Sequence, residues 1–386
     1  MRKNKKIYGQ NIFIFIIYLI MEFSSGAFFG RFLGSTEIES ELFPLYIVLF
    51  LIFLYFIMFL QTVIHELGHL LFGLATGYKF SSFRIGGVIF VKDNGKLRVK
   101  RFSLAGTAGQ CLMVPPDMKD GAVPYVMYNL GGSVMNLFVG AVTLILCFIF
   151  SDIQLLSAVL GINSSVAFGV ALTNGLPLKL GLVNNDGYNA FSLGKNKAAL
   201  RAFWLQLKIN DLISKGIRVK DMPAEWFELP SKDTMKNSMI ATVSVFRCNK
   251  LIDEHKFGEA AETIENLISS DAAIIGVHRN LLICDLLFCE LTGQNSREKI
   301  KRMLDRTQKK FMASMPKNLS IIRTWYAYYL LCENDVAKAE KYKNDFEKSA
   351  RTYPYASEIE SERELMMIAD EARERSEKII MGKEDL

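Results

Sequence analysis

Four stretches in the first half of the chain are almost free of charge. They cover residues 11–30, 43–64, 121–151 and 153–178. A membrane-crossing helix needs about 20 consecutive apolar residues, because each residue advances the helix by about 1.5 Å through a hydrocarbon layer of about 30 Å. The pattern therefore predicts four transmembrane helices and excludes a purely soluble protein.

The loop between the second and third stretches, residues 78–124, has a different pattern. Apolar and polar residues alternate over 83–91 and 97–104, around an Asp-Asn-Gly turn signal at 93–95. This pattern predicts a β-hairpin at the membrane face. Glycines and prolines in 106–116 indicate a loop, where an exposed edge can receive an extended substrate strand. A hairpin with only a structural role is the alternative.

Beyond about residue 180 a charge occurs every few residues, as in a water-soluble segment. Residues 199–213 form an amphipathic stretch, and apolar positions farther on recur at helical spacing, which predicts stacked helical hairpins. Residues 257–261 and 335–342 resemble the second helix of tetratricopeptide repeats, and a plain helical bundle is the alternative. The predicted helices cover 257–268, 277–291, 297–311, 319–331 and 336–353, with a charged helix over 358–386.

Composition and charge narrow the function classes. Half of the residues are hydrophobic and the net charge is +6, but the basic residues are spread over loops and form no stripe for nucleic acid. The six cysteines contain no C-x-x-C pair, so neither a disulfide framework nor a thiolate metal site is predicted.

The distribution of lysine and arginine predicts the orientation of the spans. The amino terminus and the 78–124 loop are rich in these residues, whereas the loops after the first and third spans are not. Because basic flanks mark the cytoplasmic side, we expect both termini inside the cell and the protein in the plasma membrane.

The end of the second span contains the motif H-E-x-x-H, formed by His65, Glu66 and His69. Histidines four residues apart on a helix project from one face and can share one Zn²⁺ ion, while the Glu is placed to take a proton from a metal-bound water. The alternative is that these polar residues lie at a helix end without any function. However, ionisable groups at the end of an apolar run are unfavourable in free energy when they enter a membrane.

A catalytic zinc ion needs a third protein ligand, and Asp186 is the best candidate. It follows the fourth span and a helix break at Pro177, so it approaches the membrane from the same side as the two histidines. Asn184 and Asn185 carry neutral amides, which are poor zinc ligands, so we expect Asn185→Ala to spare the metal. Glu22 is the only acid inside a predicted span, at a position where it can reach outer water.

These motifs together resemble the site-2 protease family of intramembrane zinc metalloproteases. The resemblance covers about residues 43–190 and uses H-E-x-x-H, the G-x-x-x-N pattern over 132–136, and N-x-x-P at 174–177 followed by Asp186-Gly187. It implies a three-helix catalytic core with His65, His69 and Asp186 as ligands and Glu66 as base. Asn185 departs from the apolar residue that usually precedes this Asp-Gly pair.

Two asparagines are further candidates with open alternatives. Asn136 lies in the third span, where it either makes a helix-packing hydrogen bond or holds the substrate backbone or oxyanion. Asn174 either grips a substrate strand or caps its helix.

The sequence thus predicts an α-helical membrane protein with three parts. These are a transmembrane metalloprotease domain (1–190), an amphipathic and turn-rich connector (191–230) and a cytoplasmic helical domain (231–386). The predicted function is zinc-dependent cleavage of a membrane-spanning or membrane-associated peptide or protein, with a possible protein partner for the tail. A noncatalytic membrane scaffold with a structural metal is the alternative.

Overall fold

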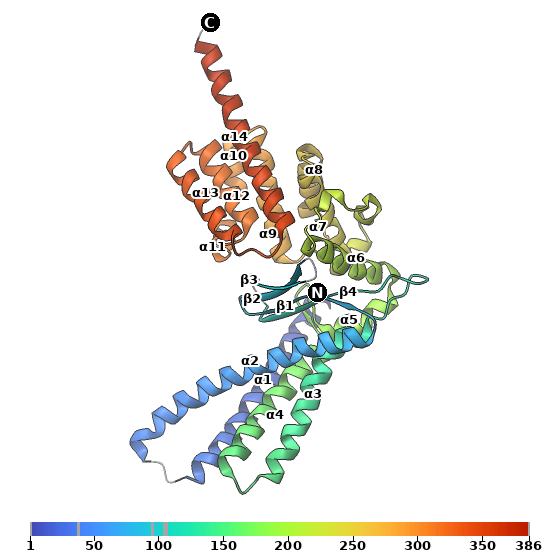
Figure 1. Ribbon diagram of the computed structural model, residues 1–386, viewed down its shortest axis with the longest axis vertical. Coiled ribbons are helices and arrows are strands. Elements are labelled where there is room, and N and C mark those ends of the chain that lie inside the picture. The colour runs from blue at the N-terminus through green and yellow to red at the C-terminus, as the bar shows by residue number, and fades with distance from the viewer. Residues whose placement is uncertain (1, 37–38, 94–95, 103–106, 385–386) are drawn as a thin grey trace. The chain divides into compact units, whose positions relative to one another are not determined.

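The computed structural model describes residues 2–36, 39–93, 96–102 and 107–384. The chain is mostly helical and contains a few antiparallel strands (Figure 1). It forms two compact units. Unit 1 consists of Met1–Gly86 and Thr107–Leu200, and unit 2 of Gly87–Gly106 and Arg201–Leu386.

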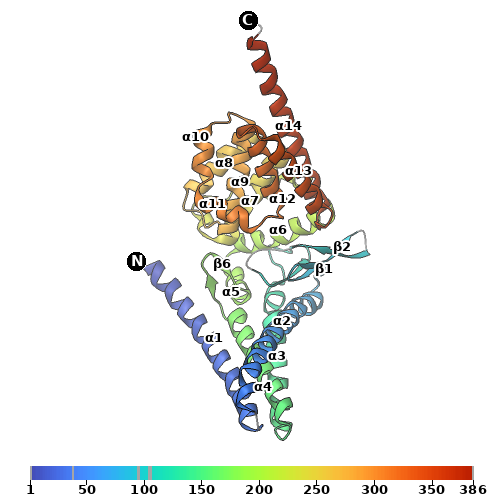
Figure 2. The same ribbon diagram turned by 90° about the vertical axis from the view of Figure 1, so that its left-hand side faces the viewer.

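Unit 1 is built on four long helices, all long and apolar enough to cross a membrane, as predicted. α3 packs against both α2 and α4, and α4 also packs against α1. Figures 1 and 2 show the four helices together. A short helical turn, η1 (Ser40–Leu42), precedes α2. The four helices are α1 (Arg2–Gly34), α2 (Phe43–Ala75), α3 (Val126–Ile149) and α4 (Gln154–Gly175).

The ends of these helices differ from the predicted spans where the chain carries proline or polar groups. α2 continues past residue 64, so the whole H-E-x-x-H motif lies within one helix. α4 ends at Gly175, before the predicted residue 178, because Leu176 precedes Pro177 and takes an extended conformation. A small hairpin of β5 (Lys179–Leu180) and β6 (Val183–Asn184) then leads into α5 (Asp186–Ser192) and η2 (Leu193–Lys195).

The loop after α2 contains more strands than its pattern predicted. The 83–91 segment is divided between β1 (Lys79–Ile85) and β2 (Val88–Asp93), with Gly86 at a positive φ of 55° between them. The predicted 106–116 loop is wrong in part, because β4 (Gly109–Val114) pairs antiparallel with β1 and buries Cys111 and Met113.

The predicted hairpin itself is present in unit 2. β2 pairs antiparallel with β3 (Lys96–Arg101). Asn94 and Gly95 of the predicted turn, and Ser103 and Leu104 of the predicted second strand, lie outside the described residues.

Unit 2 is otherwise helical. The helix predicted over 297–311 is two helices, because the Asp305 side chain accepts a hydrogen bond from the Gln308 amide (2.7 Å) and starts α11. Apolar positions of α6 are buried within the protein. The elements are α6 (Lys197–Ser214), η3 (Val219–Asp221), η4 (Ala224–Phe227), η5 (Thr234–Lys236), α7 (Ser238–Asp253), α8 (Phe257–Ser269), α9 (Gly276–Thr292), α10 (Arg297–Met303), α11 (Arg306–Ser314), α12 (Leu319–Ala327), the π-helix η6 (Tyr328–Cys332), α13 (Val336–Ala350) and α14 (Ala356–Glu384).

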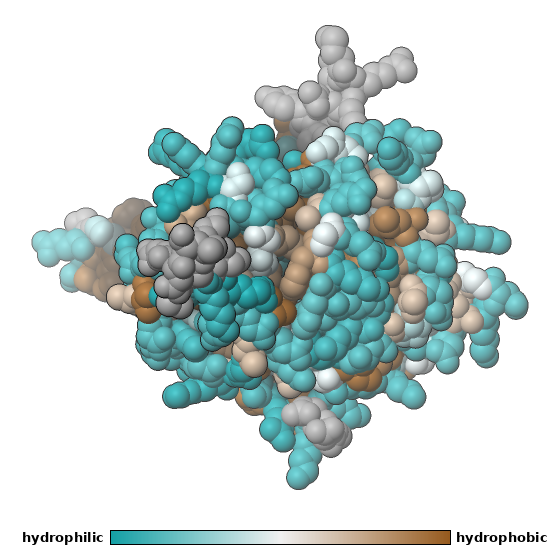
Figure 3. Space-filling view, turned by 90° about the horizontal axis from the view of Figure 1, so that it is seen from above, coloured by the Kyte–Doolittle hydropathy of each residue, from teal (hydrophilic) through white to brown (hydrophobic). Residues whose placement is uncertain are grey.

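The helices of unit 2 enclose one large apolar core. Its centre contains Leu287 and Phe288 of α9 and Ala327 of α12, all fully buried. α7 was not predicted from periodicity, because most of its residues are buried and no single apolar stripe stands out. All six cysteines are buried and unpaired, as expected. The face seen from above is mainly hydrophilic, with small apolar patches (Figure 3).

Candidate metal centre

Three side chains that lie far apart in the sequence meet in unit 1. His65 and His69 come from one face of α2, and Asp186 comes from the start of α5. The two histidine Nε2 atoms are 3.1 Å apart, and Asp186 Oδ2 lies 3.0 Å from that of His65 and 3.4 Å from that of His69. The three residues predicted as metal ligands are therefore brought together.

The other nitrogen of each imidazole has its own partner. His69 Nδ1 donates to the backbone carbonyl of Tyr128 (2.7 Å), and His65 Nδ1 donates to Asn136 Oδ1 (2.8 Å). A carbonyl oxygen can only accept, so the proton of each neutral ring is on Nδ1. Each Nε2 atom consequently directs a lone pair toward the space shared with Asp186, which is the arrangement of histidine metal ligands.

Two lone pairs and a carboxylate pointing at one another repel unless a cation lies between them. Tetrahedral zinc with bonds of about 2.0 to 2.1 Å separates its ligand atoms by about 3.3 Å. The three observed separations are close to this value, so these atoms could hold a metal ion of the size of Zn²⁺.

Asp186 is positioned by its neighbour in the chain. Asn185 Oδ1 accepts hydrogen bonds from the amides of Leu178 (3.1 Å) and Tyr188 (2.8 Å). Its Nδ2 donates to the carbonyls of Thr173 (2.8 Å) and Leu176 (2.7 Å). This one side chain therefore ties the end of α4 to the start of α5, which is a reason to expect that its loss displaces Asp186, contrary to the prediction from the sequence.

Glu66 lies beside the ligands but has no hydrogen bond or ion pair with another described residue. Its side chain is buried (7 % exposed), and Gly109 of β4 packs so closely that a Cβ there would meet the carboxylate. Arg84 of β1 is buried and donates to the carbonyls of Gly86 (2.9 Å) and Gly109 (3.3 Å). Arg84 thus holds the strand that covers Glu66, a role that its sequence position did not reveal.

Asn136 belongs to a buried polar chain across three helices. Its Nδ2 donates to the backbone carbonyl (2.9 Å) and to Oε1 (2.8 Å) of Gln61, and Gln61 Nε2 donates to Asn163 Oδ1 (2.8 Å). Both amide hydrogens of Asn136 are therefore engaged within the protein. Gln61, one turn before His65, was missed, although a polar residue inside an apolar run is a visible signal.

The remaining candidates lie outside this cluster. Asn174 donates to the carbonyl of Val170 on its own helix (3.0 Å), in line with the helix-end alternative. Glu22 is exposed on α1.

Glycines allow α2 and α3 to approach closely enough to form the site. Cβ atoms at Gly68 and Gly131 would each collide with the backbone of the other helix, and one at Gly132 would collide with the His65 ring. Close helix contact through small residues is common between membrane helices. The predicted pattern over 132–136 therefore lies directly against the histidine that it was expected to accompany.

No family model, curated protein or solved structure matches this chain.

Proposed function

We propose that this chain is an intramembrane zinc endopeptidase that cleaves a membrane-spanning or membrane-associated peptide or protein. The observation that carries the proposal is the convergence of His65 Nε2, His69 Nε2 and Asp186 Oδ2 within hydrogen-bond distances, with Glu66 adjacent. A structural zinc site closes with four protein ligands, mostly Cys, whereas two His and one Asp leave a position open.

The residues of the site have separate roles in this proposal. His65, His69 and Asp186 would hold a zinc ion, which would supply a Lewis acid for the scissile carbonyl and for water. Glu66 takes a proton from the attacking water and passes it to the leaving amine, as a general base and then a general acid. Asn136 and the Tyr128 carbonyl keep the imidazoles in the tautomer that binds metal.

The length of α2 supports an active site at the edge of a bilayer. α2 begins at Phe43, and His65 lies 22 residues farther on, which is about 33 Å along a helix. This distance is close to the thickness of the hydrocarbon layer. With the basic amino terminus and basic 78–124 loop inside the cell, both termini and the metal site lie on the cytoplasmic side of the plasma membrane.

The decisive experiment compares zinc content and proteolysis for the purified wild-type protein and Glu66→Gln. We expect about one zinc per chain in both proteins and a loss of cleavage of about 100-fold to 10000-fold in the variant, because only the base is removed. Zinc with no cleavage of membrane peptides by the wild type points to the scaffold alternative. Equal cleavage by both proteins removes Glu66 from the mechanism.

The orientation has its own test. A cysteine introduced at Glu39 is expected to react with an impermeant maleimide applied to intact cells, and one introduced at Lys96 is expected to react only after the membrane is opened. The six native cysteines are buried and contribute little background. Labelling at Lys96 in intact cells would reverse the orientation.

A further inference from the structure

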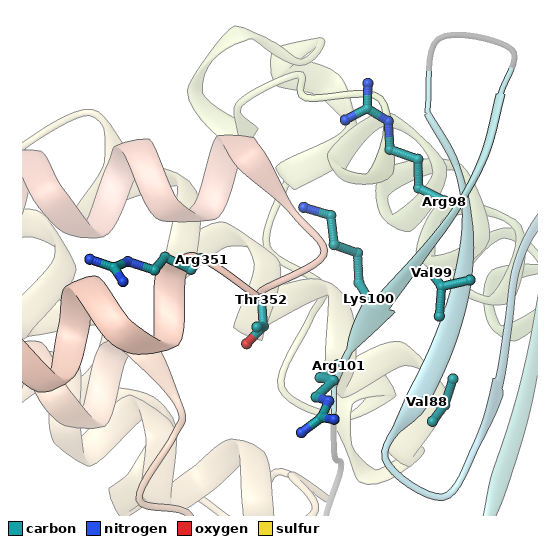
Figure 4. Close-up of a pocket in the computed structure, with 7 residues that line it drawn as sticks. All are labelled: Val88, Arg98, Val99, Lys100, Arg101, Arg351 and Thr352. Carbon is teal, nitrogen blue, oxygen red and sulfur yellow. The ribbon is translucent and has the colours of Figure 1, made fainter.

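A second polar site lies within unit 2, between the β2–β3 hairpin and the turn that joins α13 to α14. It is a cavity of about 670 Å³, and Figure 4 shows the side chains around it. Lys100 and Arg101 extend into the space beside Thr352, and the guanidinium groups of Arg98 and Arg351 lie farther out. The lining residues are Val88, Arg98, Val99, Lys100, Arg101, Arg351 and Thr352.

The two walls of this cavity are joined by specific contacts. The amide of Arg101 donates to the carbonyl of Thr352 (3.1 Å). The ring of Phe102 packs edge-on against those of Tyr353 (5.6 Å) and Tyr355 (5.7 Å). The hairpin is therefore held against the α13–α14 turn.

The charged side chains that line the cavity are all basic. No acidic residue lines it, and Lys100, Arg101 and Arg351 make no ion pair with any described residue. Elsewhere in unit 2 buried or half-exposed arginines are paired, for example Arg218 with Asp253 (2.6 Å). Lys100, Arg101 and Arg351 carry like charges that repel one another, and a bound anion would relieve this repulsion.

The chemistry of the lining indicates which anion fits. Guanidinium groups bind phosphate oxygens through paired N–H donors, and lysine adds a point charge. The lining carries several positive charges, whereas a carboxylate has a single negative charge to offer them. Val88 and Val99 are exposed by 43 % and 63 % and offer an apolar wall for the carbon part of a ligand.

We propose that this cavity binds a phosphate-bearing anion. The phosphate belongs either to the headgroup of an anionic phospholipid or to a soluble phosphate compound, since both present the same group to the cations. The headgroup source rests on the proposed membrane location, because β2 begins shortly after α2 ends and clusters of basic residues near a membrane helix attract anionic lipids. The phosphate site itself does not depend on the metal centre.

The test uses the full-length protein in nonionic detergent and titration calorimetry. The probes are short-chain phosphatidylglycerol, phosphatidylcholine of the same chain length, inorganic pyrophosphate and a polyglutamate peptide. Lys100→Gln/Arg101→Gln is compared with Lys309→Gln/Lys310→Gln, which removes the same charge from exposed positions on α11. Zinc content is measured for each protein and is expected to stay unchanged, which separates this test from that of the proposed function.

We expect the Lys100/Arg101 variant to bind a phosphate probe about 25-fold more weakly than wild type, at about fivefold for each cation, and the control variant to bind normally. A loss confined to phosphatidylglycerol identifies a lipid headgroup, and a loss seen with pyrophosphate alone identifies a soluble phosphate compound. Equal affinity in all three proteins would overturn the proposal. So would tighter binding of polyglutamate than of either phosphate probe, because the ligand would then be an acidic protein segment.

Discussion

Both units bury charged and polar side chains, but they neutralise them differently. In unit 2 Arg323 is fully buried, and its guanidinium lies 2.6 Å from Asp285 and 2.8 Å from Glu362. It also lies over the ring of Phe288, 4.6 Å from the centroid. Both acids of this cluster contact a cation that the chain itself supplies.

In unit 1 the corresponding cluster contains acceptors and no cation of its own. The lone pairs of His65 and His69 and the carboxylate of Asp186 face one another, and their outer atoms are already engaged. The contrast distinguishes a cluster that stabilises the fold from one that we propose an external ion completes. Substitutions in either cluster test this difference.

The largest effect is expected at the metal ligand. Asp186→Asn replaces a charged side chain by a neutral amide of the same shape. Zinc affinity should fall by more than about 10-fold to 100-fold, which is the loss typical when a residue that hydrogen-bonds to a ligand is removed. Cleavage should be abolished. Zinc competition with a chelator and a peptide-cleavage assay measure the two quantities. Asp152→Asn, at an exposed position, is the control. Full zinc occupancy with normal cleavage in Asp186→Asn would remove Asp186 from the site.

The second-largest effect is expected for Arg323 and its two acidic partners in unit 2. Arg323→Met leaves Asp285 and Glu362 without their cation and should lower the free energy of unfolding by about 3 to 5 kcal/mol, with zinc content unchanged. Arg363→Met breaks an exposed pair with Glu347 and should cost about 0 to 1 kcal/mol. The three tryptophans, Trp204, Trp226 and Trp325, all lie in unit 2, so their fluorescence reports its unfolding. Similar stability of both variants would contradict the assigned role of Arg323.

The smallest effects are expected for residues that position the ligands. Asn136→Ala removes the partner of His65, and Asn185→Ala removes four hydrogen bonds beside Asp186, so each should lower zinc affinity by about 10-fold to 100-fold. Asn174→Ala is the matched control, since its amide bonds only the carbonyl of Val170. The same zinc competition assay applies. Unchanged affinity in Asn185→Ala would restore the expectation drawn from the sequence.

Much of unit 1 follows from local pattern. Long apolar runs predicted four helices, and H-E-x-x-H placed His65 and His69 on one helical face, because a helix repeats every 3.6 residues whatever surrounds it. The positions of helix ends were less predictable. α2 continues through its polar motif because those polar groups find partners on α3 and α5, which no local window contains.

The strands of the 78–124 segment show the same limit. Alternation and the turn signal predicted the β2–β3 hairpin, whose register is local. The pairing of β1 with β4 joins residues more than twenty positions apart and depends on burial of Cys111 and Met113. Glycines and prolines near β4 indicated a loop, and the tertiary contact outweighed that local tendency.

The sequence by itself predicted four long apolar helices and identified His65, Glu66 and His69 as candidate site residues. It also made Asp186 a candidate ligand, because this residue carries a carboxylate and follows a helix break. Only the tertiary structure decided that Asp186 Oδ2 lies 3.0 Å from His65, that Asn185 holds it there, and that the Tyr128 carbonyl directs His69. The physical reason is the separation along the chain of the residues that interact. Helical periodicity acts over neighbouring residues, whereas the convergence of ligand atoms depends on backbone approach at Gly68 and Gly131 and on hydrogen bonds between elements distant in the chain.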